Sequence, residues 1–346
     1  MDYLQLDQSC SRGHGRRVQS NIHTAAIIGP DTPLRQKLVE ELSSENHLIK
    51  PIVFDSIEEN LGSVSFDTVV LLAEALGSRV DKWPSLNDPF LGETRIVWSD
   101  KPHLVIVTSA LVYGARPDNP IPITEKSSVA PNTDLPFANR LVAIEQRGHH
   151  WRSDQISQSS NPSDVCLSIL RPALVLGEKG RWPDFVLMKG LGIPPGDGDP
   201  PMQFIHVDDL VSAIAFVCER RLDGIFNVAS DGWLDGSQVR ALAGTPQHLL
   251  IPSRIARFRQ RRAENLMGGL LPYCTHPWVV ANDALKAAGW DPNFTNAQAF
   301  VSINRGTLWS RLSPKRRQEF ALVTFAGALV GFGVAIAGAA RRWLKS

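Results

Sequence analysis

Apolar residues recur along this chain in short unbroken runs, and longer segments with helical spacing separate the runs. Six runs have the length of a buried strand: 24–29, 49–55, 66–73, 104–109, 165–170 and 224–228. Continuous apolar runs of this length are typical of parallel strands that are buried on both faces. After the first run, Leu34, Leu38 and Leu42 recur every four residues, which predicts a helix with one apolar face. This alternation predicts an α/β fold with a doubly wound parallel sheet.

A different pattern occupies residues 320–340, which contain no charge and include nine Phe, Leu, Val or Ile residues. A helix of this length spans about 30 Å, the thickness of a hydrocarbon core. We therefore expect one transmembrane helix that contacts membrane lipid, after a basic linker at 313–319 and before a basic tail at 341–346. Because both flanks are basic, the positive-inside rule does not orient the helix. A helix buried in the protein's own core is the alternative.

Composition narrows the remaining function classes. Lys and Arg total 36 and Asp and Glu 35, so net charge gives no case for nucleic acid binding. The four cysteines are scattered, which indicates neither a metal site nor a disulfide framework and places the soluble part in the cytoplasm. Residues 1–22 are polar and lack the apolar core of a signal peptide. We expect a disordered tail there; a basic arm that touches lipid is the alternative.

Five segments carry a family resemblance: LVIVTSALVYG (104–114), LSILRPALVLG (167–177), GDGDPPMQFIHVDD (196–209), LDGIFNV (222–228) and WVVANDALKAAGWDPNFTNAQ (278–298). In this order, they resemble the extended short-chain dehydrogenase/reductase superfamily, in particular its NAD-dependent epimerase/dehydratase group. The resemblance is greatest to the actinobacterial branch, in which active sites are often incomplete.

The resemblance implies a Rossmann-like dinucleotide-binding domain and a smaller C-terminal substrate lobe. The first would comprise 23–177, with its sheet completed by 204–230, and the second 178–203 and 231–312. It also implies NAD or NADP as cofactor, a small-molecule substrate, and a homodimer to which a helix at 135–146 contributes. It gives His206, Asp208 and Asp209 the role of bracing the two lobes.

The expected phosphate-binding turn follows the first apolar run. The family pattern is G-x-x-G-x-x-G, in which glycines let backbone amides approach a diphosphate at a helix N-terminus. Here Gly29 is the first glycine, while Thr32 and Arg35 stand at the second and third positions. Thr32 can still bond a phosphate through its hydroxyl, but Arg35 puts a long side chain where helix and strand should meet closely. Asp31 adds a negative charge, and an ordinary strand–helix turn is the alternative.

The resemblance places further cofactor contacts at the ends of the next three runs, at Asp55, Ala73 and Thr108. If 49–55 is the second strand, Asp55 would accept hydrogen bonds from the adenosine ribose and favour NAD. If it is the third strand, Asp55 would lie near the adenine; a solvated carboxylate is equally consistent. Only eleven residues separate Asp55 from Asp67, which is short for the family. We therefore expect one strand or helix of the family fold to be missing between them.

The family's proton-transfer residues are a Tyr, a Lys four residues later and a Ser or Thr. Ser109 matches the last of these. Aligning Glu145 with the family's acidic residue puts Phe137 at the Tyr position and Leu141 at the Lys position. No Y-x-x-x-K occurs in the chain, because its tyrosines, Tyr3, Tyr113 and Tyr273, are followed four residues later by Asp7, Pro117 and Pro277. Losing positioned acid/base catalysis typically costs about 10²–10⁴-fold in rate.

Substrate-side positions depart from the nucleotide-sugar enzymes as well. Leu174 stands in place of their Asn and Met202 in place of their Arg. Apolar side chains at Trp182, Trp233, Met202 and Phe204 favour a more apolar ligand or belong to the core. Two functions follow: a membrane-anchored, NAD(P)-binding protein with weak or altered oxidoreductase or isomerase activity, or a catalytically inactive nucleotide sensor or membrane assembly partner. No metal site is expected.

Overall fold

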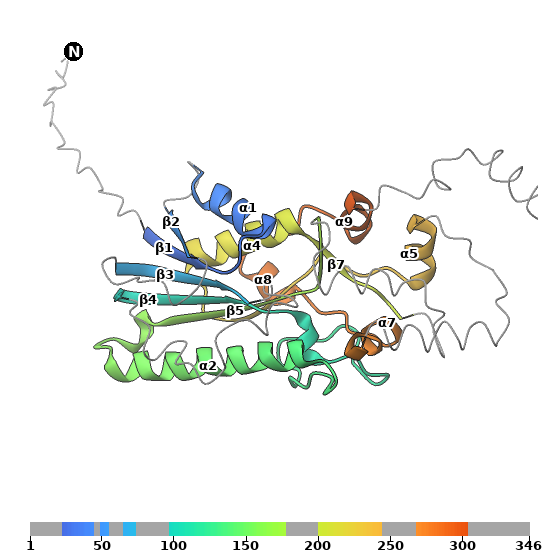
Figure 1. The fold of residues 1–346 in the computed structure, drawn as a ribbon, viewed down its shortest axis with the longest axis horizontal. Helices are drawn as coiled ribbons and strands as arrows, with labels where there is room; N and C mark the ends of the chain where they lie inside the picture. Colours follow the sequence, from blue (N-terminus) through green and yellow to red (C-terminus); the bar gives the residue numbers. More distant parts are fainter. Residues whose placement is uncertain are drawn as a thin grey trace, which may run out of the picture.

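A sheet of six parallel strands forms the centre of the computed structural model, which describes residues 23–44, 49–54, 65–73, 97–177, 200–243 and 268–303 (Figure 1). The strands are β1 (His23–Ile28), β2 (Ile49–Phe54), β3 (Ser65–Leu72), β4 (Val97–Val107), β5 (Cys166–Pro172) and β8 (Gly224–Val228). Their order is β2-β1-β3-β4-β5-β8, and every neighbouring pair is parallel. The predicted α/β fold with a parallel sheet is confirmed.

The strand order identifies the second apolar run. In a Rossmann sheet the order is 3-2-1-4-5-6, so the second strand lies directly beside the first. Here β2 pairs with β1, with Phe54 opposite Ile28, and β3 pairs with the other side of β1. The pairing therefore agrees with the interpretation of 49–55 as the second strand. No strand lies beyond β2 among the described residues, and the third place of the family order is empty there.

Helices cover both faces of the sheet. α1 (Pro33–Leu42) and α4 (Val207–Arg220) lie on one face, and α2 (Pro136–Gln158) runs along the other (Figure 1). Each face has its own apolar cluster: Ala25 and Ile27 of β1 pack on the α1 side, whereas Ala26 and Ile28 pack on the α2 side. The predicted apolar face of the first helix is confirmed, because Leu34, Leu38 and Leu42 are fully buried.

Shorter elements connect the strands of the sheet and make up the described part of the C-terminal region. They are η2 (Ala110–Tyr113), η3 (Pro162–Asp164), β6 (Leu174–Leu176), β7 (Phe204–His206), α5 (Gly236–Ala243), η4 (Gly268–Leu270), α7 (Pro272–Thr275), α8 (Asp283–Ala287) and α9 (Asn296–Ile303). β6 and β7 form a separate parallel pair. Of the segment 204–230 that was expected to complete the main sheet, only β8 joins it.

Several predicted segments lie outside the described residues. They include the tail 1–22, Asp55, Trp182, most of 178–203, and the expected transmembrane helix with its linker. Within the described ranges, no helix is both long enough and apolar enough to cross a bilayer.

Candidate functional site

The carboxyl ends of β1, β3 and β4 bring four of the predicted site residues to one edge of the sheet. Gly29 follows β1, Ala73 follows β3, and Thr108 and Ser109 follow β4. The three strands are neighbours in register, so these residues lie side by side where α/β proteins bind their ligands. Ala73 and Thr108 are fully buried and Ser109 almost so. The structure thus brings these four positions together at the carboxyl edge of the sheet.

Gly29 is required by a close approach between two strands. A Cβ atom at this position would lie 3.0 Å from the Cβ atom of Leu72, a separation that real Cβ contacts hardly reach. The Gly29 amide donates a hydrogen bond to the Phe54 carbonyl at 3.2 Å. A side chain here would force Leu72 of β3 to shift by a few tenths of an ångström, so the first glycine of the family pattern keeps a structural purpose in this chain.

Thr32 is the N-cap residue of α1. Its Oγ1 accepts a hydrogen bond from the Arg35 amide at 3.3 Å, as is usual at a helix start. The hydroxyl proton stays available, so Thr32 can still donate to a phosphate oxygen. Pro33 has no N–H group, and the Arg35 amide is used by the cap. The first helical turn therefore retains only the Leu34 amide as a backbone donor for an anion, fewer than an uncapped glycine turn offers.

The Arg35 side chain lies in the turn between β1 and α1, where its position in the sequence puts a long side chain. Its side chain is only 9% exposed and folds back into the turn. Nη1 donates to the Gly29 carbonyl at 2.7 Å, and Nη2 lies 3.1 Å from the Asp31 carboxylate. The Gln36 amide also donates to Asp31, at 3.1 Å. The hydrogen bond from Gln36, followed by that from Arg35, lowers the pKa of Asp31.

The two positions expected for catalytic Tyr and Lys lie inside the protein. Phe137 and Leu141 occupy the first turns of α2, which contacts η2 just after Ser109. They are 5% and 0% exposed, and both belong to the apolar cluster under that face of the sheet. Neither side chain can carry a proton. The Ser109 hydroxyl oxygen accepts from the Leu111 amide at 3.4 Å and so caps η2.

A buried cluster of polar residues joins α2, η2, β4, β5 and β8 behind this edge. Arg171 donates to Glu145 through Nε at 3.0 Å and Nη2 at 2.5 Å, and to the Tyr113 hydroxyl at 2.9 Å. Tyr113 donates to Asn227 at 2.8 Å, and Thr108 donates to Glu145 at 2.7 Å. Arg171 therefore ties α2 to η2.

This cluster does not replace the missing proton-transfer residues. A buried ion pair persists only when its remaining hydrogen-bonding capacity is also satisfied, as it is for Glu145 and Arg171. Burial raises the pKa of Tyr113, so its hydroxyl keeps its proton. Because the polar groups of these side chains already bond one another, they orient the site and do not exchange protons with a ligand.

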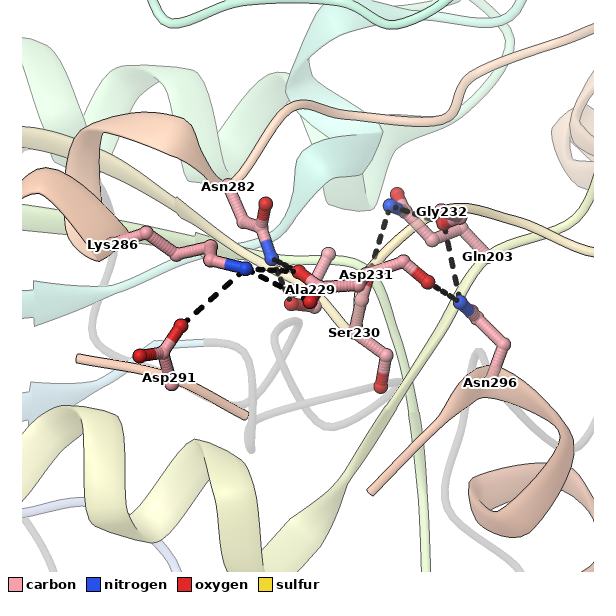
Figure 2. A network of polar contacts seen from close by, with 9 residues as sticks. All are labelled: Gln203, Ala229, Ser230, Asp231, Gly232, Asn282, Lys286, Asp291 and Asn296. Atoms are coloured by element: carbon pink, nitrogen blue, oxygen red, sulfur yellow. Dashed lines mark hydrogen bonds and ion pairs between the residues drawn. The ribbon is translucent and has the colours of Figure 1, made fainter. Parts of the chain in front are cut away.

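A second polar network fastens the loop after β8 to the C-terminal region (Figure 2). Gln203 Nε2 donates to the carbonyl groups of Gly232 at 3.0 Å and Val280 at 2.9 Å, and its Oε1 accepts from the Val280 amide at 2.8 Å. Asn296 donates to the carbonyl group of Asp231 at 2.8 Å. Asn282 donates to the Asp231 carboxylate at 2.9 Å. Sequence reasoning missed this network, because no spacing rule signals it.

The segment that was expected to brace the two lobes is tied to both sides. The Asp209 carboxylate is fully buried and accepts from the amides of Asn293 and Phe294, each at 2.9 Å. The His206 ring stacks on Phe294 with 4.0 Å between ring centroids. On the other side, Asp208 lies 2.6 Å from Lys37 of α1. The contacts agree with the structural role that the resemblance assigned to this segment.

Three of the apolar substrate-side residues belong to the core. Met202 and Phe204 are 7% and 0% exposed and pack in the cluster on the α2 side, as does Leu174. Trp233 is 41% exposed. Among the described residues, no group of His, Cys, Asp or Glu could hold a metal ion.

Comparison with known proteins shows which family this chain matches. The model of the NAD dependent epimerase/dehydratase family matches residues 47–229, which begins after β1, the phosphate turn and α1. A curated relative, "Uncharacterized protein y4nG" of Sinorhizobium fredii, is 24% identical over 255 residues, which are 65% of this chain. The match covers 61% of that relative, so this chain spans about three-fifths of its length.

Solved structures share the fold at low sequence identity. Human epimerase family protein SDR39U1 with NADPH is 18% identical with a TM-score of 0.54, over 82% of this chain and 100% of that chain. RMD from Pseudomonas aeruginosa with NADPH is 18% identical with a TM-score of 0.55, over 82% and 98%. A short-chain dehydrogenase/reductase superfamily protein from Agrobacterium tumefaciens with bound NAD is 14% identical with a TM-score of 0.56, over 85% and 100%. With the family model covering more than half of its length, this chain belongs to the NAD dependent epimerase/dehydratase family.

Proposed function

We propose that this protein binds NAD or NADP at the carboxyl edge of its sheet without the family's Tyr–Lys proton transfer, and acts as a nucleotide-responsive component at a membrane. The burial of Phe137 and Leu141 at the start of α2 carries the proposal. Catalysis by this family needs a proton donor beside the nicotinamide, and these side chains supply an aromatic ring and an isobutyl group.

Nucleotide binding is supported by the residues of the phosphate-binding turn after β1. Gly29 still permits close strand packing. The Leu34 amide and the Thr32 hydroxyl are hydrogen-bond donors for a phosphate, and Arg35 adds a guanidinium. Three structurally similar proteins were solved with NADPH or NAD, which supports a dinucleotide as the ligand class. When bound, the cofactor would supply a hydride donor or acceptor. Thr32 and Arg35 would hold it, together with Asp55 if β2 ends as the second strand of the family does.

The membrane part of the proposal rests on the sequence. Residues 320–340 contain 21 uncharged positions between basic flanks, which favours a single membrane-spanning helix with the soluble part in the cytoplasm. Dimerisation through α2 is a further expectation from the family resemblance. The chain would then present a paired nucleotide-binding domain at a lipid surface.

Residual oxidoreductase or isomerase activity on a small apolar substrate is the second candidate. It is favoured by Ser109, which the structure keeps at the carboxyl end of β4. Its weakness is the absence of a proton carrier at the two positions on α2 that follow it, where the structure describes only apolar side chains.

Cofactor titration of the full chain in detergent micelles tests both candidates. We expect NAD⁺, NADH, NADP⁺ or NADPH to bind, as measured by calorimetry, without substrate-dependent change in nicotinamide absorbance. Absence of binding up to millimolar cofactor would overturn the proposal, and turnover by the unaltered chain would favour the second candidate.

Restoring the missing pair provides a sharper version of this test. Phe137→Tyr with Leu141→Lys should introduce weak oxidoreductase activity if the remaining cleft is intact. Because Leu141 is 0% exposed, the new amine should cost about 2–4 kcal/mol of stability, which NADH binding partly restores. Phe137→Tyr alone is the matched control, and it should bind cofactor without turnover.

A further inference from the structure

The phosphate turn is where this chain departs most from its family. The family match starts at residue 47 and leaves out 23–46, although β1 and α1 have the expected places in the fold. In this turn the Arg35 guanidinium bridges the Gly29 carbonyl and the Asp31 carboxylate. We call these three groups the turn clasp. The departure in sequence therefore coincides with an ion pair across the binding turn.

The two charged members of the clasp are held unequally. The Arg35 side chain is 9% exposed, and its second contact is a backbone carbonyl that cannot move independently of β1. The Asp31 side chain is 65% exposed, and its other partner is the flexible Gln36 side chain. Asp31 can therefore rotate into water at small cost, whereas Arg35 stays in the turn.

The guanidinium is also the strongest anion-binding group that the turn offers. Pro33 has no amide proton, and the Arg35 amide is bonded to Thr32, so backbone donors are few. A guanidinium binds carboxylate and phosphate with similar geometry. Asp31 and a diphosphate consequently compete for one group.

We propose that Asp31 is an internal competitor for the diphosphate of the ligand: a nucleoside diphosphate or dinucleotide enters the turn by replacing the Asp31 carboxylate as the partner of Arg35. The exchange makes and breaks no covalent bond. This inference rests on the proposed nucleotide-binding function and adds a specificity determinant to it. A ligand without a diphosphate cannot displace Asp31, so the clasp selects against nucleosides and monovalent carboxylates.

Removal of the competing carboxylate tests the exchange. In the full chain, Asp31→Asn should tighten binding of NAD⁺ and of ADP by about tenfold, because Arg35 is released and a like charge is removed. Adenosine, which lacks phosphate, should bind equally to both proteins. Arg35→Met should weaken ADP binding by about tenfold. Asp118→Asn is the matched control, since Asp118 is an exposed carboxylate on the loop after η2 and its loss changes net charge equally.

Nuclear magnetic resonance of the Asp31 carboxyl carbon provides a readout that needs no dinucleotide. The Gln36 and Arg35 hydrogen bonds lower the pKa of Asp31 in the free protein. Saturation with inorganic pyrophosphate should raise that pKa toward its ordinary value, because Arg35 changes partner. An unchanged Asp31 titration at saturating pyrophosphate would overturn the exchange.

The outcomes separate this inference from the proposed function. If the unaltered chain binds NAD⁺ and Asp31→Asn binds it no more tightly, the proposed exchange at the turn clasp is wrong and nucleotide binding stands. If only Asp31→Asn binds, the clasp is supported and the unaltered chain is not a nucleotide-binding protein. If neither protein binds NAD⁺, ADP or pyrophosphate, both ideas fail.

Discussion

His103 lies fully inside the protein on β4, where it is paired with Thr68 of β3 and with Cys166 at the start of β5. Its Nε2 atom is 2.8 Å from the Ser168 hydroxyl oxygen, and that hydroxyl donates its own proton to the Leu222 carbonyl. Nε2 must therefore carry the ring proton and donate it. Nδ1 is buried and has no hydrogen-bond partner within the described structure. A second ring proton would consequently place an unpaired charge in the core.

Burial accordingly lowers the pKa of His103 to about 3, with the positive charge of Arg221 as a smaller cause. Below the ordinary histidine pKa of about 6.5, the unfolded chain binds a proton that the folded chain refuses. The contribution of this residue is complete above pH 6.5 and is lost as the pH falls from 6.5 towards 3.

We expect His103→Gln to flatten the acid side of the stability profile. The difference in unfolding free energy between pH 7 and pH 5 should be about 2 kcal/mol smaller than in the unaltered chain. Urea unfolding of the full chain in detergent measures this difference. His149→Gln, at an exposed position of α2, should leave the profile unchanged. Equal pH dependence in all three proteins would mean that His103 is protonated in the folded state.

At the scale of elements, short apolar runs located the strands well and missed the small ones. The runs at 24–29, 66–73 and 224–228 agree with β1, β3 and β8 to within one residue at each end. β4 begins at Val97, seven residues before its apolar run, because residues 99–103 (SDKPH) interrupt the apolar pattern. β6 and β7 have three residues each, too few to show a period.

The positions of candidate site residues could be predicted from the sequence where their spacing from a motif residue was enough to assign them. Ser109, Phe137 and Leu141 followed from their distances to Gly114 and Glu145, and the structure brings α2 against η2 as that alignment requires. The turn clasp was not predictable, since the direction of the Arg35 side chain depends on which carbonyl the completed sheet presents. Bonds between Gln203 and residues about 30 and 77 positions away are equally invisible to local patterns.

The Gln203 network makes the attachment of the C-terminal elements sensitive to one amide. Gln203→Met keeps the size of the side chain but removes its hydrogen bonds to Val280 and Gly232. The Val280 amide and two or more carbonyl groups then lose their partners in a buried setting. We expect a loss of about 2–4 kcal/mol in unfolding free energy.

Chemical unfolding measures this loss, and Gln158→Met at the exposed end of α2 is the matched control. Hydrogen exchange adds a local test, because the Val280 amide should exchange faster in Gln203→Met than in the control. A loss below 0.5 kcal/mol, with exchange unaltered, would show that water replaces the side chain without cost.

For the whole molecule, membrane attachment should depend on the apolar balance of residues 320–340. Nine large apolar residues contribute roughly −3 to −5 kcal/mol on the insertion scale, and each central Asp costs about 2.5–3.5 kcal/mol. Val330→Asp with Val334→Asp should therefore release the full chain from membranes during carbonate extraction.

The matched control places the same two changes on the described domain. Val53 and Val301 are exposed valines of β2 and α9, so Val53→Asp with Val301→Asp should leave the chain in the membrane fraction. If the central pair also stays there, a core helix or a peripheral contact explains the segment instead.

The Asn296 hydrogen bond also sets an order of events during synthesis. It joins α9 to the Asp231 carbonyl, 65 residues earlier in the chain. At 5–20 residues per second, a ribosome needs roughly 3–13 s to add that length. During this interval the six-stranded sheet has all its strands, but the Asp231 carbonyl group still lacks the Asn296 amide that it bonds in the folded chain. The loop after β8 can therefore complete its hydrogen bonds only after the last described helix has been synthesised.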